Sequence, residues 1–336
     1  MFRPETERKE KIISHAAPLA PSQKFYSLNK ILLAALASLG YILLSNLVVG
    51  YRSDHLALVL LFNLLYFSSQ ATRSLILGFT IIIVYWILFD YMKAFPNYLF
   101  NDVHIKSLYD LEKELFGISS GGAILTPNEY FSKNNFIALD LLSGFFYFCW
   151  IPVPVLFGTI LFFRNRRIFF EFSLTFFFAN LLGFIGYYAF PAAPPWYVAF
   201  HGFDFVADTP GHAAGLSRFD AYFGVELFKG IYDKSSNVFA AMPSMHSAFM
   251  LIVLYYGIKS GFRYYNLVFA LIMMGIWFTA VYSGHHYFLD VLAGILTAII
   301  AIAVFQLLAN HSRSCNSLIN WFMKLTRARK PTDLVI

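Results

Sequence analysis

Long apolar runs dominate this chain, and their lengths predict helices that cross a membrane. A transmembrane helix needs roughly 20 consecutive apolar residues. The sequence contains eight stretches near that length, which are residues 31–51, 55–70, 74–91, 136–163, 168–190, 243–258, 264–283 and 286–310. The run 55–70 is the weakest, because it is short and ends in polar residues. The other runs are apolar nearly all round, as expected of helices that are buried or face lipid.

The composition supports this interpretation. Of 336 residues, 58% are hydrophobic and only 13% are charged, whereas a soluble domain carries about twice that charged fraction. The net charge is +6, but the basic residues lie between apolar runs, so we expect no nucleic-acid partner. Cys149 and Cys315 do not indicate a disulfide framework. We therefore predict an all-α fold, a polytopic membrane helical bundle of about eight transmembrane helices.

The positions of Lys and Arg predict how the bundle is oriented. Basic residues concentrate on the cytoplasmic side of membrane proteins. With a cytoplasmic N-terminus, most of the 25 basic residues fall on that side, and most of the 19 acidic residues fall on the other. This bias supports eight spans, with residues 1–30 as a cytoplasmic segment, 31–310 as one transmembrane catalytic domain and 311–336 as a basic cytoplasmic tail. Omitting the run 55–70 would reverse only the segments before it.

One of the long connections predicted on the non-cytoplasmic side has its own periodicity. Ile105, Leu108, Leu111 and Leu115 recur at helical spacing. This pattern predicts an amphipathic helix in the membrane interface. A helix packed on the loops of its own protein is an equally good interpretation.

A histidine and an aspartate near the last apolar run form the most informative pair. His286 precedes Asp290 by four residues, which on a helix separates the side chains by only about 40° around the axis. The carboxylate can hold one imidazole nitrogen and leave the other free as base or nucleophile. His285 would lie about 140° from Asp290 and point elsewhere. A buried His–Asp hydrogen bond that merely ties two helices is the alternative.

His246 begins the sixth apolar run behind Pro243. The free N–H groups and the positive end of a helix favour a bound anion there, although His246 could instead simply cap the helix. Ser244 is interpreted first as an N-cap and second as a phosphate contact. The predicted orientation brings His246, His286 and Asp290 to one face, which predicts one shared site. No acidic cluster with ligand spacing accompanies the histidines, so we expect no metal ion.

Several motifs around these residues resemble those of known families. Pro243-Ser244-x-His246 followed by His286-x-x-x-Asp290 resembles the second and third signatures of the type 2 phosphatidic acid phosphatase superfamily. More narrowly, four segments resemble signatures of inositol phosphorylceramide synthases, namely residues 190–197, 214–220, 242–247 and 285–290. The order and approximate spacing of the motifs agree from about residue 90 to 310.

The resemblance implies a helical membrane core and a phosphoryl transfer without metal or cofactor. His286 would attack the donor phosphorus and form a phosphohistidine, and Asp290 would fix its tautomer. His246 would protonate the departing diacylglycerol alkoxide and then help to deprotonate the acceptor hydroxyl. The implied partners are a phosphatidylinositol-like phospholipid donor, a ceramide acceptor and the lipid bilayer.

The chain departs from the phosphatase branch at its phosphate-binding positions. The corresponding residues here are Ala280, Gly183 and Phe190, none of which can neutralise an anion. We expect Arg218 to bind the phosphate through its guanidinium fork, held in place by Asp220, although the two could form an ion pair without substrate. Further substrate contacts are expected from Ser244, His285, Trp196 and Tyr197. A diester donor carries less charge than a monoester, which favours a transferase.

Two other functions fit the same residues less well. A lipid phosphate phosphatase would use water in place of the acceptor alcohol. A transporter would use the histidines and aspartate as a proton relay near mid-membrane, whereas here they lie at helix ends on one face. We expect the site to face the periplasm of a bacterial inner membrane or the lumen of the Golgi. The oligomeric state cannot be predicted from the sequence.

Overall fold

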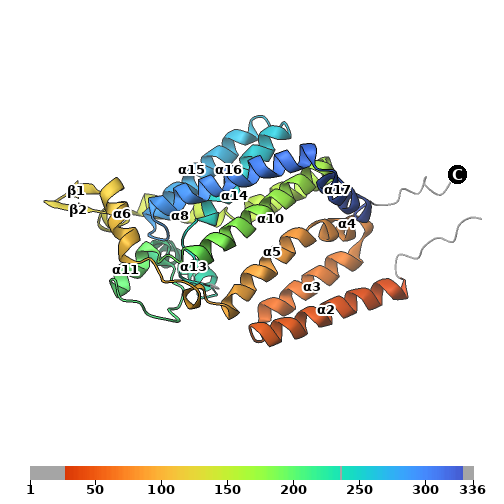
Figure 1. The fold of residues 1–336 in the computed structure, drawn as a ribbon, viewed down its shortest axis with the longest axis horizontal. Helices are drawn as coiled ribbons and strands as arrows, with labels where there is room; N and C mark the ends of the chain where they lie inside the picture. The colour runs from red at the N-terminus through yellow and green to blue at the C-terminus, as the bar shows by residue number, and fades with distance from the viewer. Residues whose placement is uncertain (1–26, 235–236, 328–336) are drawn as a thin grey trace, which may run out of the picture.

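A computed structural model describes residues 27–234 and 237–327. Within these residues the chain is mostly helical, which confirms the predicted all-α class. Figure 1 shows long helices in an elongated bundle, with loops and short helices gathered at one end. The predicted N-terminal segment up to residue 26 and the predicted tail from residue 328 lie outside the described residues.

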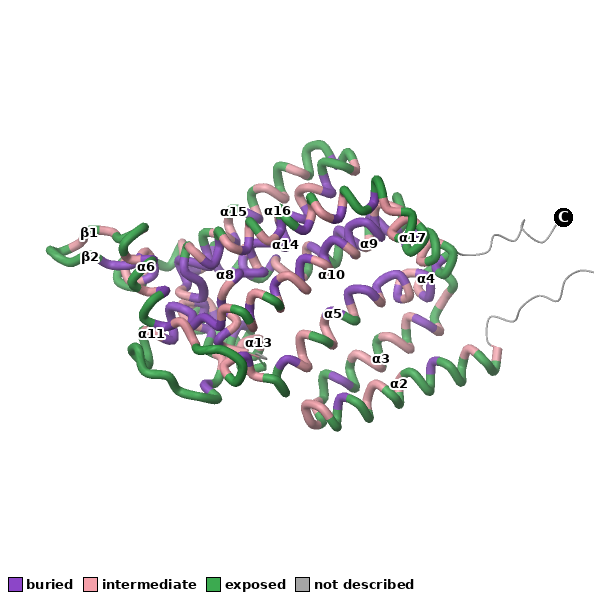
Figure 2. Tube along the Cα trace, in the orientation of Figure 1, coloured by how far each residue is buried: buried purple, intermediate pink, exposed green. Residues whose placement is uncertain are grey.

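The N-terminal part is a helical hairpin followed by a bent helix pair. The hairpin consists of α2 (Leu28–Val48) and α3 (Ser53–Ser68). Next come α4 (Gln70–Gly78) and α5 (Thr80–Tyr91), which meet at an angle of 48°, so the predicted run 74–91 is not one straight helix. Figure 2 shows α2 mostly in the colour of exposed residues. Exposed leucines along α2 are expected of a helix that faces lipid.

Short elements fill the first long connection. They are η1 (Met92–Ala94), η2 (Asn97–Leu99), α6 (Lys106–Phe116), β1 (Ile118–Ser120), β2 (Ala123–Leu125) and α7 (Pro127–Lys133). The two strands pair antiparallel, with Ser119 opposite Ile124. The helix α6 coincides with the predicted amphipathic segment. Its apolar residues divide, because Leu108 is buried whereas Leu111 and Leu115 are exposed.

The core of the bundle is built around one long helix. Its members are α8 (Ile137–Phe148), α9 (Pro152–Arg164), α10 (Arg166–Ala189), α14 (Met245–Lys259), α15 (Tyr265–Tyr282) and α16 (Phe288–His311). The helix α10 packs against α5, α9, α14 and α16. The predicted run 136–163 breaks before Pro152, which lies at the start of α9 and has no N–H for a continuing helix. Buried phenylalanines such as Phe169 and Phe172 fill the core between these helices.

The second long connection lies against the first. It contains α11 (Pro195–His201), η3 (Ala214–Leu216), α12 (Ser217–Phe223) and α13 (Leu227–Tyr232). Isolated parallel bridges join His104 to Ala192 and Ala192 to Ala240. The bridges bring together three chain segments that are far apart in sequence. They hold the two long connections together, and these two connections form the loop layer at one end of the bundle.

Helix length and composition support a membrane protein. Within the part of the chain that the structure describes, five helices are long and apolar enough to cross a membrane, namely α2, the α8–α9 pair counted as one, α10, α15 and α16. The bent pair of α4 and α5 passes the same test jointly, and α3 and α14 are shorter apolar helices.

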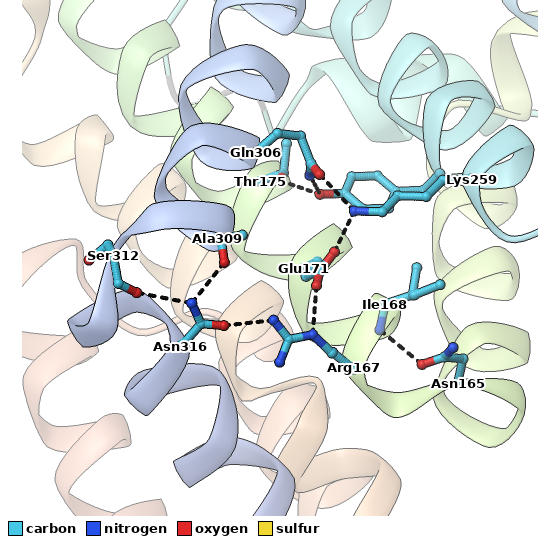
Figure 3. A network of polar contacts seen from close by, with 11 residues as sticks. Asn165, Arg167, Ile168, Glu171, Thr175, Lys259, Gln306, Ala309, Ser312 and Asn316 are labelled. Carbon is cyan, nitrogen blue, oxygen red and sulfur yellow. Dashed lines mark hydrogen bonds and ion pairs between the residues drawn. The ribbon is translucent and has the colours of Figure 1, made fainter.

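A polar network ties the helices together at the end of the bundle remote from the loop layer (Figure 3). Glu171 of α10 accepts from Arg167 Nε at 3.1 Å and from Lys259 Nζ at 2.6 Å. The Arg167 guanidinium also donates to Asn316 Oδ1 at 2.6 Å. Asn316 belongs to α17 (Arg313–Leu325), a helix within the predicted tail that the sequence analysis did not anticipate.

Candidate active site

Two histidines from different parts of the chain meet at the loop end of the bundle. His246 is the second residue of α14, and His286 lies in the short connection between α15 and α16. The Nδ1 atom of His246 is 3.0 Å from Nε2 of His286, which is hydrogen-bond distance. His286 is buried and His246 half-buried. The predicted convergence of these two residues is therefore present in the structure.

The relation between His286 and Asp290 differs from the predicted one. The helix α16 begins only at Phe288, so His286 precedes the helix rather than lying on it. Asp290 Oδ2 accepts from the Tyr287 N–H at 2.8 Å, because a carboxylate in the first turn can cap the free N–H groups there. His286 Nδ1 is 3.5 Å from the same oxygen and has no hydrogen-bond partner among the described residues. The pair is close without being directly hydrogen-bonded.

Buried polar contacts fix the backbone around His286. The Asn128 amide donates to the carbonyls of Val281 and His286, both at 2.8 Å. The His286 N–H donates to the Ala280 carbonyl at 2.9 Å. Gly284 has a φ of 76°, a left-handed conformation that glycine adopts without strain. The histidine is thus held by α7 and α15 before any substrate binds.

Glu112 of α6 caps the helix that carries Asp290. Its carboxylate is fully buried and accepts from the backbone N–H groups of Phe288 at 2.8 Å and Leu289 at 3.1 Å. Burial raises the pKa of Glu112 to about 7, against the opposing effect of these hydrogen bonds. The sequence analysis missed Glu112, because its periodicity argument used only the apolar positions of this helix.

His285 is held by a different set of groups from His286, and its predicted direction relative to Asp290 stays a prediction. Its Nε2 lies 3.0 Å from the Ala213 carbonyl, an arrangement in which the nitrogen donates. The ring stacks on Tyr232 with centroids 4.1 Å apart and on Tyr147 at 5.6 Å. Burial lowers the pKa of His285 to about 3, so the ring is neutral near pH 7. Tyr147 also stacks on His246 and thereby aligns the two rings.

A cavity of about 510 Å³ opens beside the histidines. It is lined by His246, His285 and His286, together with Trp196 from the second long connection. Its volume lies in the range of small-molecule sites. Tyr197 is fully buried elsewhere and donates its hydroxyl to the Asp204 carbonyl, and the predicted substrate contact of Tyr197 stays a prediction.

The expected pairing of Arg218 with Asp220 is wrong. Arg218 Nε instead donates to Asp140 of α8 at 2.6 Å, and Tyr282 donates to the same carboxylate oxygen. Asp220 accepts from the backbone N–H groups of Phe228 and Lys229 and so caps α13. Neither Arg218 nor Asp220 is among the described residues that line the cavity.

At the three positions that correspond to cations in the phosphatase branch, the structure has closely packed residues. Ala280 is fully buried. A Cβ at Gly183 would lie 2.7 Å from Met245 Sδ, so no lysine fits without displacing that side chain. Phe190 stacks on His104 at 3.8 Å between ring centroids.

Ser244 occupies the N-cap of α14 as predicted, but its side chain makes no capping hydrogen bond.

Two cations that the sequence analysis did not select line the cavity. They are Arg52, at the start of α3, and Lys234, just after α13. Their sequence neighbourhoods carry no motif, so only the packing of the N-terminal hairpin against the loop layer reveals them. Within residues 27–234 and 237–327, no group of three or more His, Cys, Asp or Glu residues is arranged to hold a metal ion.

Comparisons with known proteins agree on one family. The PAP2 superfamily model matches residues 124–304. A phosphoinositol dihydroceramide synthase of Bacteroides thetaiotaomicron is 44% identical over 268 residues, which are 79% of this chain and 88% of the relative. The inositol phosphorylceramide synthase catalytic subunit of Schizosaccharomyces pombe is 27% identical over 74% of this chain and 58% of its own length. No solved structure matches the chain.

Proposed function

The chain belongs to the PAP2 superfamily, and from this premise we propose that it is a membrane lipid phosphotransferase. It moves a phosphoinositol-type headgroup from a glycerophospholipid to the hydroxyl of ceramide and releases diacylglycerol. The names of the similar proteins support the reaction class, since they are synthases of phosphoinositol dihydroceramide and inositol phosphorylceramide. The observation that carries the proposal is the approach of His246 Nδ1 to His286 Nε2 beside a cavity.

In the first half-reaction, His286 Nε2 attacks the donor phosphorus. The bond between phosphorus and the diacylglycerol oxygen breaks as the bond from nitrogen to phosphorus forms. Protonated His246 gives its proton to the departing oxygen, so diacylglycerol leaves as a neutral alcohol. The phosphoryl group enters between the two nitrogens and replaces their direct contact. Asp290, 3.5 Å from His286 Nδ1, stabilises the imidazolium that forms.

In the second half-reaction, the roles of the two histidines reverse. The ceramide hydroxyl gives its proton to His246, and its oxygen attacks the phosphorus of the phosphohistidine. The bond from nitrogen to phosphorus breaks, which restores His286 and leaves the headgroup on ceramide. The hydrogen bond from Asn128 to the His286 carbonyl and the turn at Gly284 fix the histidine, so that both steps can use one geometry.

The reaction can be tested with purified protein and inositol-labelled phosphatidylinositol, with and without ceramide. We expect labelled inositol phosphorylceramide only when ceramide is present. With donor alone, denatured protein should carry an acid-labile label that His286→Ala lacks. Release of inositol phosphate in place of lipid product would identify a hydrolase that uses water instead of ceramide as the acceptor, and the absence of any turnover would contradict the proposal.

The proposed topology has eight spans with both ends in the cytoplasm and the histidines on the other face. The spans are α2, α3, the α4–α5 pair, the α8–α9 pair, α10, α14, α15 and α16. The exposure of Leu111 and Leu115 supports the placement of α6 in the membrane interface on the same face as the histidines. In this proposed topology the reaction takes place in the periplasmic or lumenal leaflet.

Cysteine labelling tests the orientation. Cys149 and Cys315 are first replaced by serine, and single cysteines are then introduced at Lys229 or at Tyr264, which is 88% exposed. An impermeant thiol reagent added outside the cytoplasm should label position 229 and leave position 264 unlabelled until the membrane is opened. The reverse pattern would move the reaction to the cytoplasmic leaflet.

A further inference from the structure

A second polar cluster lines the cavity that holds the histidines. Arg52, Asp54 and His55 come from the start of α3, Asp90 from the end of α5, and Lys234 from the segment after α13. All five line the cavity together with His246 and His286. Three chain segments that are distant in sequence therefore bring charged side chains to the reaction site.

Mutual hydrogen bonds hold this cluster in place. Arg52 donates to Asp90 Oδ1 at 2.8 Å and to Asp54 Oδ2 at 3.2 Å. His55 Nε2 lies 2.9 Å from Asp90 Oδ2, and Lys234 Nζ donates to Asp54 Oδ1 at 2.9 Å. His55 is only 4% exposed, and its ring packs edge-on against Tyr41. The cluster is thus ordered at its buried end before a ligand binds.

The hydrogen-bonding groups of the cluster are only partly used. A guanidinium has five N–H donors and an ammonium three, whereas Arg52 uses two and Lys234 one in the contacts above. Carboxylate oxygens each have a second lone pair. Close by, the buried Asn237 Nδ2 lines the cavity and has no partner among the described residues. The wall therefore offers both donors and acceptors to a ligand.

The charge of the cluster shows which ligand it fits. The charges of the two cations are balanced by those of the two carboxylates. The cluster therefore does not provide the strong positive field that a phosphate monoester favours. Alternating donors and acceptors instead match a ring of hydroxyl groups, because each hydroxyl both donates and accepts.

We infer that the Arg52–Asp54–Asp90–Lys234 cluster is the donor-headgroup subsite, which binds the polyhydroxylated cyclitol of the phospholipid donor while its phosphorus faces His286. This inference rests on the proposed transfer reaction and adds the source of donor specificity. The N-terminal hairpin of α2 and α3 is then a part of the active site and does more than anchor the protein in the membrane. The competing interpretation is that the cluster only ties the hairpin to the loop layer.

The test uses the full-length protein and two conservative variants, Asp54→Asn and Arg52→Lys. Because these lose hydrogen bonds to the headgroup and no group that touches the reacting atoms, we expect KM for phosphatidylinositol to rise about tenfold or more. The catalytic constant and KM for ceramide should change less than about threefold. Asn63→Ala is the matched control, because Asn63 joins α3 to Ser38 of α2 away from the cavity.

A binding measurement separates this inference from the proposed reaction. Glycerophosphoinositol, which carries the headgroup without acyl chains, should raise the thermal midpoint of the wild type and of Asn63→Ala but not of the two cluster variants. Glycerophosphocholine should raise none of them. If the wild type transfers the headgroup and the cluster variants keep wild-type KM and the midpoint shift, the subsite is wrong and the reaction stands. Cluster variants that lose thermal stability but keep the wild-type KM for phosphatidylinositol would also overturn the subsite. That result would mean that the cluster only joins the hairpin to the loop layer.

Discussion

The polar regions at the two ends of the bundle differ in how completely their buried polar groups are hydrogen-bonded. At the remote end, Glu171 receives a cation on each carboxylate oxygen, and Arg167, Lys259 and Asn316 all have partners (Figure 3). At the loop end, His286 Nδ1, Asp290 Oδ1 and Ser244 Oγ are buried without a hydrogen-bond partner among the described residues. The Glu171 carboxylate has a partner on each oxygen, whereas these three atoms of the candidate site have none within the part of the chain that the structure describes.

This difference separates a structural role from a chemical one. A buried polar group without a partner costs folding free energy, so a stable fold normally pairs it. The unpaired atoms at the loop end are those that a phosphoryl group and its imidazolium would use. We therefore expect substitutions at the loop end to change the rate, and substitutions at the remote end to change stability.

The largest expected effect is at the nucleophile. His286→Ala should lower the transfer rate by about 10³-fold or more, because removal of a covalent nucleophile leaves only binding and orientation. Asp290→Asn should also remove most activity. Thermal midpoints measured alongside the rates should stay near that of the wild type. A His286→Ala protein that keeps more than about a tenth of the rate would falsify the assignment.

The next effect is on stability at the remote end. Glu171→Gln leaves Lys259 and Arg167 without their carboxylate and should lower the free energy of unfolding by about 1–3 kcal/mol. The catalytic constant per folded molecule should not change. Thermal unfolding in detergent, combined with assays below the midpoint, measures both. If Glu171→Gln kept full stability but had a lower catalytic constant, the proposed division between a structural end and a chemical end of the bundle would be wrong.

A smaller effect is expected at His285. His285→Ala removes the contact with the Ala213 carbonyl and the stacking on Tyr232, and neither contact involves Asp290. The catalytic rate should fall less than about tenfold. A loss as large as that of His286→Ala would mean that His285 takes part in the chemistry.

The last expected effect is a pH dependence of stability set by Glu112, with no change in the chemistry of the histidines. Its pKa is raised from 4.5 to about 7 in the folded chain, so the unfolded chain loses this proton first as pH rises. The stabilising contribution is therefore complete below about pH 4.5 and is lost as pH rises through about 7. Glu112→Gln should flatten the thermal midpoint over this range, whereas Glu114→Gln, on the exposed side of the same helix, should keep the wild-type slope. Equal slopes in all three proteins would contradict this role.

The sequence predicted the parts of the molecule that depend on local pattern. Apolar runs predicted the long helices, because a lipid-facing or buried helix must be apolar along its whole length. The prediction failed locally where backbone chemistry intervened, as at Pro152. The spacing of His286 and Asp290 predicted their proximity, although an N-terminal capping bond, and not a continuous helix, sets it.

What the sequence by itself determined was the membrane class, the helical bundle and the residues of its motifs, His246, His286 and Asp290. The tertiary structure alone decided which distant groups support and surround them. Glu112 contacts Phe288 across 176 residues, and Lys234 contacts Asp54 across 180. It also gave Arg218 the partner Asp140 in place of Asp220. The physical reason is that periodicity reports which face of a segment is buried, whereas the packing of the whole bundle decides which segments meet there.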